Sequence, residues 1–130
     1  MILDSSAIVA LVMDEPGADG IERALAGAAR VGVGAPTLLE TSIVLSARLG
    51  RDARPLLHRL LRVLDAEIVV FDEGQFECAM DGWTRYGKGR HPAALNYGDC
   101  LAYGTAKGLS QPLLCVGDDF PRTDLDLVPT

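Results

Sequence analysis

Hydrophobic residues in this chain occur in short runs, separated by longer stretches in which apolar and polar positions repeat at helical spacing. Such runs predict buried strands at Met1–Leu3, Val31–Gly34 and Leu113–Val116, and the β-branched segment Glu67–Phe71 predicts a fourth. Leu125–Val128 is a candidate for a short fifth strand. Short apolar strands that alternate with helices favour a parallel sheet covered on both faces, so the expected fold class is α/β.

The stretches between these runs predict helices with recognisable ends. Ser5 or Ser6 is expected to cap a first helix that runs through Val12, and Pro16 is expected in the first turn of a second. The remaining expected helices are Thr37–Leu49 closed by Gly50, Asp52–Leu64, one ending around Trp83–Tyr86, and one from Asn96 or Tyr97 to Gly108.

Length and composition indicate one globular domain spanning 1–130. With 130 residues, 48% of them hydrophobic and 23% charged, the chain can bury a core and does not have the composition of a disordered protein. No apolar run approaches the roughly 20 residues that span a bilayer, and Asp4 interrupts an N-terminal run without a basic flank. Three widely spaced cysteines fit reduced core positions, and two histidines are too few for a histidine metal cage. We therefore expect a cytoplasmic protein with no membrane partner.

The formal net charge of −6 argues against a nucleic-acid partner, but the charge is unevenly distributed. Five arginines lie in the segment from Arg48 to Arg62, whose one acid is Asp52, and Lys88 and Arg90 lie in a second basic cluster. Both segments could follow a phosphate backbone. The alternative for the arginine-rich segment is a solvated helix face.

Several acids follow predicted strands at the edge where open α/β sheets bind ligands. Asp4 ends the first strand, Glu40 lies in the first turns of the helix after the second, and Asp118-Asp119 follow the last strand after one glycine. Asp99 lies near the start of a helix with apolar neighbours. Each acid alone could be a turn, cap or first-turn residue.

Carboxylates that converge without cationic partners repel one another, and their pKa values rise. A hard divalent cation such as Mg²⁺ or Mn²⁺ removes this penalty, because it prefers oxygen ligands. Such a site suits phosphodiester hydrolysis, with either one or two ions.

Other catalytic motifs are missing from the sequence. Gly32-x-Gly34 begins like a dinucleotide-binding fingerprint, but Thr37 occupies the place of the third glycine. A receiver-like phosphate-transfer domain also gathers acids at strand ends, but it needs a lysine after a later strand. No lysine follows Val116, and Lys107 precedes that strand.

Four segments together resemble PIN-domain ribonucleases of the VapC toxin type. The segments are MILDSSAIVALVMDEPG, APTLLETSIVL, LNYGDCLAYGTAK and LLCVGDDFPRTDL, and the resemblance covers essentially the whole chain. It implies a PIN-like three-layer α/β/α fold around a mainly parallel sheet of four to five strands. It also implies a Mg²⁺-dependent endoribonuclease, with Mn²⁺ as a substitute. Such a toxin is a homodimer within a toxin–antitoxin hetero-oligomer, and a cognate VapB-type antitoxin neutralises it.

The resemblance also assigns roles to residues. It implies that Asp4 and Asp99 are direct metal ligands and that Glu40 completes the acidic cluster and helps to orient or deprotonate the attacking water. Asp118 is favoured as the fourth acid, with Asp119 as its competitor. Two supporting residues are expected, Ser6 beside Asp4 and Asn96 at the helix entry beside Asp99. Candidate RNA contacts are Arg48, Arg51, Lys88 and Arg90.

Partner binding leaves two further hypotheses. Leucines of the Leu56–Leu64 helix that are not fully buried would form a groove for an antitoxin helix. A non-catalytic PIN domain that acts only through such binding is the other alternative, although all four acidic positions are intact.

Overall fold

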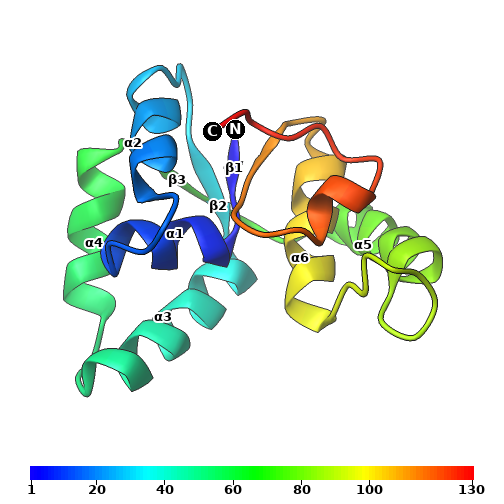
Figure 1. Cartoon of the computed structure of the whole chain (residues 1–130), viewed down its shortest axis with the longest axis horizontal. Coiled ribbons are helices and arrows are strands. Elements are labelled where there is room, and N and C mark those ends of the chain that lie inside the picture. Colours follow the sequence, from blue (N-terminus) through cyan, green and yellow to red (C-terminus); the bar gives the residue numbers. More distant parts are fainter.

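The computed structural model describes residues 1–130 and has three layers, with a sheet between two groups of helices (Figure 1). The strands are β1 Ile2–Leu3, β2 Gly32–Gly34, β3 Glu67–Val69 and β4 Leu113–Leu114. Their order is β3-β2-β1-β4 and every pairing is parallel, which confirms the expected fold class. The fifth strand is reduced to an isolated bridge between Leu113 and Leu127.

Six α-helices and one 3₁₀ turn cover the sheet. In Figure 1, α1 to α4 lie on one side of the strands, and α5 and α6 lie on the other. The bounds are α1 Ser5–Val12, α2 Ala18–Ala26, α3 Ala35–Leu49, α4 Arg54–Val63, α5 Glu73–Tyr86, α6 Tyr97–Gly108 and the 3₁₀ turn η1 Phe120–Arg122.

Two helix starts differ from the sequence-based prediction. Asp4, and neither Ser5 nor Ser6, caps α1, because its carboxylate accepts a hydrogen bond from the Ser6 backbone N–H. Pro16 lies outside α2, which begins at Ala18 after Gly17 in a left-handed conformation. By contrast, Gly50 ends α3 as expected, with a positive φ of 67°.

The sheet separates two hydrophobic cores. In β1, Leu3 packs into the core under α1 to α4, whereas Ile2 packs into the core under α6. In β4, Leu114 and Leu113 divide in the same way. Because successive side chains of a strand point to opposite faces, a strand buried on both sides needs a continuous apolar run, as these two strands have.

The strand order places a topological switch beside β1. From β1 the chain moves outward to β2 and β3, and it then returns through α5 and α6 to β4 on the other side of β1. The carboxyl ends of β1 and β4 are therefore neighbours whose following loops diverge, which is where open α/β sheets bind ligands.

No helix of the structure has the length and apolar character to cross a membrane.

Helices α5 and α6 approach each other closely because glycines line their contact. A Cβ atom at Gly104 would lie 2.5 Å from the Gln75 carbonyl oxygen and 2.7 Å from the Ala79 Cβ atom. The buried Gln75 side chain fixes this contact, since its Nε2 donates to the Val70 carbonyl at 2.9 Å and its Oε1 accepts from the Thr105 hydroxyl at 3.0 Å. The layer that carries α6 thus depends on a small residue at position 104.

We predict that Gly104→Ala lowers the free energy of unfolding by about 2 kcal/mol, because the added methyl group meets backbone atoms that cannot move aside easily. Thermal unfolding followed by circular dichroism should show Tm lower by roughly 5 to 10 °C. Gly27→Ala is the matched control, because a Cβ atom there has only ordinary contacts at 3.9 Å. Equal Tm values for the two variants would contradict the close approach.

Candidate active site

The carboxylate of Asp4 is buried at the carboxyl end of β1, with only 4% of the residue exposed. Its Oδ2 accepts hydrogen bonds from the Ser6 backbone N–H at 3.0 Å and from the Ser6 hydroxyl at 2.5 Å. The Asp4 backbone N–H donates to the Leu114 carbonyl at 2.9 Å, which continues the pairing with β4. One side-chain oxygen is therefore fixed by the start of α1.

Ser6 also connects the two loops that diverge at the switch point. Its hydroxyl oxygen accepts a hydrogen bond from the Val116 backbone N–H at 3.0 Å while its proton goes to Asp4. The segment after β4, which leads to Asp118 and Asp119, is thereby held beside Asp4. The structure thus gives Ser6 the supporting contact expected from the sequence.

Asp99 lies in the first turn of α6 and is held by a capping box. The Asp99 carboxylate accepts from the Asn96 backbone N–H at 3.0 Å, and the Asn96 side-chain oxygen accepts from the Asp99 backbone N–H at 2.9 Å. This reciprocal pair fixes the helix start and the acid together. Asn96 therefore acts at the helix entry, as expected.

Glu40 reaches the same edge from α3. Its carboxylate packs against Gly98, the residue before Asp99, so closely that a side chain at position 98 would collide with it. The starts of α1, α3 and α6 all lie at the lower edge of the sheet in Figure 1. Gly98 thus provides the space that allows the Glu40 carboxylate to lie against the start of α6, where its charge acts on Asp4.

The acids after β4 are not equivalent. Both are exposed, but the charge of Asp119 contributes to the raised pKa of Asp99, whereas Asp118 is not among the causes of that rise. Asp119 also precedes η1, whose Phe120 is buried in the α6-side core. The charge of Asp119 therefore reaches Asp99, and this makes Asp119 a stronger competitor to Asp118 for the place of the fourth acid.

Burial and mutual repulsion shift the titration of this cluster. Burial raises the pKa of Asp4, the hydrogen bonds from Ser6 partly offset that rise, and the charge of Glu40 adds to it. Burial also raises the pKa of Asp99, with further repulsion from Asp4 and Asp119. None of the four acids has a lysine, arginine or histidine within 4.0 Å, because all ion pairs of the chain lie elsewhere.

Two cysteine thiols adjoin the acids. Burial, followed by the charges of Asp4 and Asp99, raises the pKa of Cys115 to about 12, and burial with Asp99 raises that of Cys100 to about 11. Both thiols stay protonated near neutral pH and add no charge to the site. The sequence predicts Cys115 only as a reduced core residue, and the placement of β4 beside β1 brings it to this edge.

The donor set fits a hard divalent cation. It consists of carboxylate oxygens, one of them buried, without a cation of the protein to neutralise them. As the side chains stand, no group of three acidic, histidine or cysteine residues is arranged to hold a metal ion. The resemblance required only Asp4 and Asp99 as direct ligands, and Mg²⁺ usually keeps several waters and takes one or two carboxylates.

The predicted basic contacts lie in different environments. Arg48 pairs with Glu15 at 2.5 Å, and Arg90 stacks over the Trp83 ring with 4.2 Å to its centroid. Arg51 and Lys88 form no ion pair. Exposed pairs of this kind contribute little and exchange readily. Lys107 contacts Asp124 at 3.1 Å and none of the four acids, which removes the lysine that a receiver-like site would need.

Comparison with known proteins identifies similar chains. Residues 1–125 match the family model of the PIN domain. Ribonuclease VapC36 of Mycobacterium tuberculosis is 48% identical over 127 residues, covering 97% of this chain and 91% of that protein. Ribonuclease VapC of Mycolicibacterium smegmatis is 41% identical over 128 residues, covering 98% and 99% of the two chains.

Solved structures share the fold at lower sequence identity. Mycobacterium tuberculosis VapC20, described as a sarcin–ricin loop cleaving toxin, superposes with a TM-score of 0.78 at 17% identity and covers 99% of this chain and 98% of its own. A chain of a toxin–antitoxin complex from Klebsiella pneumoniae has a TM-score of 0.70 at 15% identity, with coverages of 99% and 97%.

We predict that Asp99→Asn stabilises the metal-free protein at neutral pH, because it removes one of the repelling charges and keeps a side-chain oxygen for the capping box. A carboxyl group whose folded-state pKa is raised lowers stability as pH rises above its ordinary value of 3.8. The difference in Tm between variant and wild type should therefore grow from about pH 4 upward.

Added Mg²⁺ tests the same site without an activity assay. It should raise the Tm of the wild type by several degrees and that of Asp99→Asn much less, because a ligand stabilises only the state that binds it. Equal Mg²⁺ responses in the two proteins, at any pH, would exclude Asp99 as a ligand.

Proposed function

This chain belongs to the PIN-domain family, and from that membership we propose that it is an RNA-cleaving nuclease, the toxin of a toxin–antitoxin pair in the cytoplasm. The main support for this chemistry is that Asp4, Glu40, Asp99 and Asp119 lie at one edge of the sheet and that no cation of the protein neutralises them. We propose that cleavage is endonucleolytic hydrolysis of phosphodiester bonds and that it requires Mg²⁺, for which Mn²⁺ can substitute.

Each acid has a distinct role in this proposal. Asp4 and Asp99 would hold the ion, each already oriented by its own hydrogen bonds. When bound, the ion supplies positive charge for the phosphate and acidifies nearby water. Glu40, on a separate helix, would orient the attacking water and accept its proton. We propose Asp119 as the fourth acid in preference to Asp118, because its charge acts on Asp99.

Basic segments on either side of the acids support an RNA path. In Figure 1 the end of α3 and the loop between α5 and α6 lie on opposite sides of the edge where α1, α3 and α6 begin. The first carries Arg48 and Arg51, and the second carries Lys88 and Arg90. An RNA strand that contacts both segments would cross the acids, with its phosphates held by charges that give no sequence preference.

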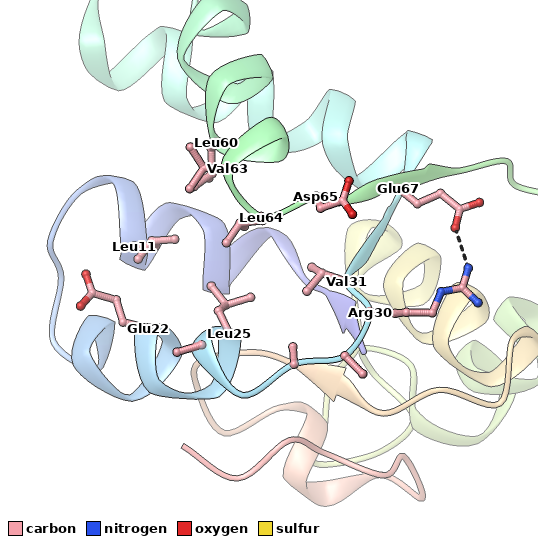
Figure 2. A pocket seen from close by; sticks show the side chains of 13 residues that line it. Leu11, Glu22, Leu25, Arg30, Val31, Leu60, Val63, Leu64, Asp65 and Glu67 are labelled. Atoms are coloured by element: carbon pink, nitrogen blue, oxygen red, sulfur yellow. Dashed lines mark hydrogen bonds and ion pairs between the residues drawn. The ribbon is translucent and has the colours of Figure 1, made fainter.

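A separate groove supports antitoxin binding. Figure 2 shows it between α4, which contributes Leu60, Val63 and Leu64, and the helices that carry Leu11 and Leu25. Its volume is about 720 Å³, and acids outnumber cations on its rim, with Glu22, Asp65 and Glu67 against Arg30. An amphipathic antitoxin helix with leucine-like residues on one face and basic flanks would fit this groove.

We also propose that the toxin is a homodimer within the toxin–antitoxin complex. Exposed large apolar side chains gather on α3, at the end of β3 and on α5, away from the antitoxin groove. Several exposed apolar residues on the same elements are typical of an interface.

We predict that Asp4→Asn lowers RNA cleavage by at least about a hundredfold, since loss of even an outer partner of a metal ligand costs roughly 10- to 100-fold. Asparagine keeps an oxygen for the two Ser6 donors, so the fold should remain. The measurement is sequencing of RNA ends after induction of wild type and variant side by side, with purified protein assayed in Mg²⁺ and in EDTA.

Two outcomes of that experiment would overturn the proposal. Cleavage that persists equally in Asp4→Asn and in EDTA would place the activity elsewhere. A folded wild type that binds the antitoxin but cleaves no RNA with either ion would make the chain a non-catalytic PIN domain.

For the groove, we predict that Val63→Asp weakens binding of the small protein encoded alongside by about tenfold or more, because a carboxylate would be buried against apolar side chains. Val63 is 78% exposed, so the substitution should not disturb folding. Phe76→Asp, at a position on α5 that is 51% exposed and does not line the groove, is the control in the same calorimetric titration. Equal affinities for both variants would exclude this groove.

A further inference from the structure

One carboxylate outside the acidic cluster gathers three side chains from two helices. Asp124 lies just after η1, and its Oδ1 accepts a hydrogen bond from the Tyr103 hydroxyl at 2.7 Å. Its Oδ2 pairs with the Arg85 guanidinium at 3.2 Å and with the Lys107 ammonium at 3.1 Å. The Lys107 ammonium also donates to the Asp124 carbonyl oxygen at 3.2 Å. Asp124 therefore ties the segment after η1 to both α5 and α6.

These contacts form a connected network, whereas a single exposed ion pair would contribute little. Tyr103 is only 2% exposed, so its hydroxyl needs a partner within the protein, and Asp124 is that partner. Burial acts to raise the pKa of Asp124, but the hydrogen bonds from Tyr103 and Lys107 and the charges of Lys107 and Arg85 lower it overall. The carboxylate thus stays ionised near neutral pH and keeps all three partners.

One face of α6 links this network to the acidic site. Asp99, Tyr103 and Lys107 are each four residues apart, so they lie in one row along the helix. The first belongs to the proposed metal site, and the other two hold Asp124. The Tyr103 ring is itself fixed, because a Cβ atom at Gly82 of α5 would lie 2.5 Å from its Cδ1 atom.

The segment from Asp119 to Asp124 follows this row. At its start the charge of Asp119 acts on Asp99, and at its end Asp124 accepts from Tyr103. Phe120, between them, is 4% exposed and packs into the α6-side core. Four residues of an α-helix span about 6 Å, and the three residues of η1 also span about 6 Å. The segment therefore matches the distance along α6 between the acid and the tyrosine.

The other end of this loop is fixed separately. The Val116 backbone N–H donates to the Ser6 hydroxyl at 3.0 Å. Gly117 follows with a positive φ of 107° and with open space around it, so the backbone is free to turn at that point. A second anchor beyond the acids is then needed to fix their direction, and Asp124 supplies it.

We propose that Asp124 is a positioning residue of the nuclease. Its contacts with Tyr103, Lys107 and Arg85 hold η1 along α6 and so place Asp119 beside Asp99. This inference rests on the proposed function, in which Asp119 is the fourth acid of a Mg²⁺ site, and it adds a group that acts on that site only through Asp119.

Tyr103→Phe is the most direct test, because it removes one hydroxyl, keeps the ring and changes no charge. Calorimetric titration of the purified protein with Mg²⁺ should show a Kd raised roughly threefold to tenfold, less than the 10- to 100-fold that loss of a direct partner of a metal ligand costs. Asp124→Asn should shift the Kd in the same direction. Asp126→Asn is the control, because it removes the same charge from the same segment but its side chain forms no ion pair. Its Kd should equal that of the wild type.

A double variant tests whether the effect passes through Asp119. Asp119→Asn alone should raise the Kd for Mg²⁺, and adding Tyr103→Phe to it should raise the Kd no further, because coupled residues do not act additively. A merely structural role would lower the Tm of Tyr103→Phe and leave its Kd for Mg²⁺ unchanged. That result, or an effect of Tyr103→Phe that persists in full beside Asp119→Asn, would overturn the proposal.

Amide hydrogen exchange in the metal-free protein separates this inference from the nuclease proposal. The N–H groups of Arg122 and Thr123 donate to the carbonyls of Asp119 and Phe120 at 3.2 and 3.0 Å, and their exchange should be at least about threefold faster in Tyr103→Phe. If exchange rises but the wild type binds no Mg²⁺ and cleaves no RNA, the function fails while the anchoring of the segment stands. If the wild type cleaves RNA but neither exchange nor Mg²⁺ affinity changes in Tyr103→Phe, the inference fails while the function stands.

Discussion

The arrangement of this molecule depends on keeping a buried carboxylate, Asp4, beside other carboxylates without a positive side chain to neutralise them. Removing a charge from water is costly, and like charges nearby add to that cost, which raises the pKa values of both Asp4 and Asp99. The two hydrogen bonds from Ser6 offset only part of the penalty. Carboxylates with perturbed pKa values are typical of functional sites. A cation that binds there would offset the electrostatic free energy that the fold loses by burying them together.

The parallel sheet makes this convergence possible. Asp4, Glu40, Asp99 and Asp119 lie far apart in the sequence, yet each follows a strand or begins a helix at the same edge. The switch of strand order beside β1 opens the space between the loops, and the Ser6 hydroxyl connects them through Val116. The rest of the fold, including the close contact of α5 with α6, holds the start of α6 at that edge.

Sequence patterns were sufficient to predict strands and helix ends where one physical cause determines the local structure. Continuous apolar runs identified the strands buried on both faces, and Gly50 ended α3 where it was expected. They were wrong where two neighbours compete for one role, because Asp4 and Ser6 both have capping oxygens and only the structure shows that Asp4 caps α1. The choice between Asp118 and Asp119 is of the same kind, because adjacent acids in one loop have no local pattern that separates them.

The net charge of −6 poses a problem for a protein that cleaves a polyanion, because long-range attraction cannot bring RNA to an acidic pocket. Binding must then come from short-range contacts, through basic segments on either side of the acids and through a divalent ion between carboxylate and phosphate. The unneutralised acids and the acidic overall charge thus both require a source of positive charge at the site. Both are compatible with RNA cleavage only if positive charge reaches the acids, from a bound divalent ion and from the basic segments that lie beside them.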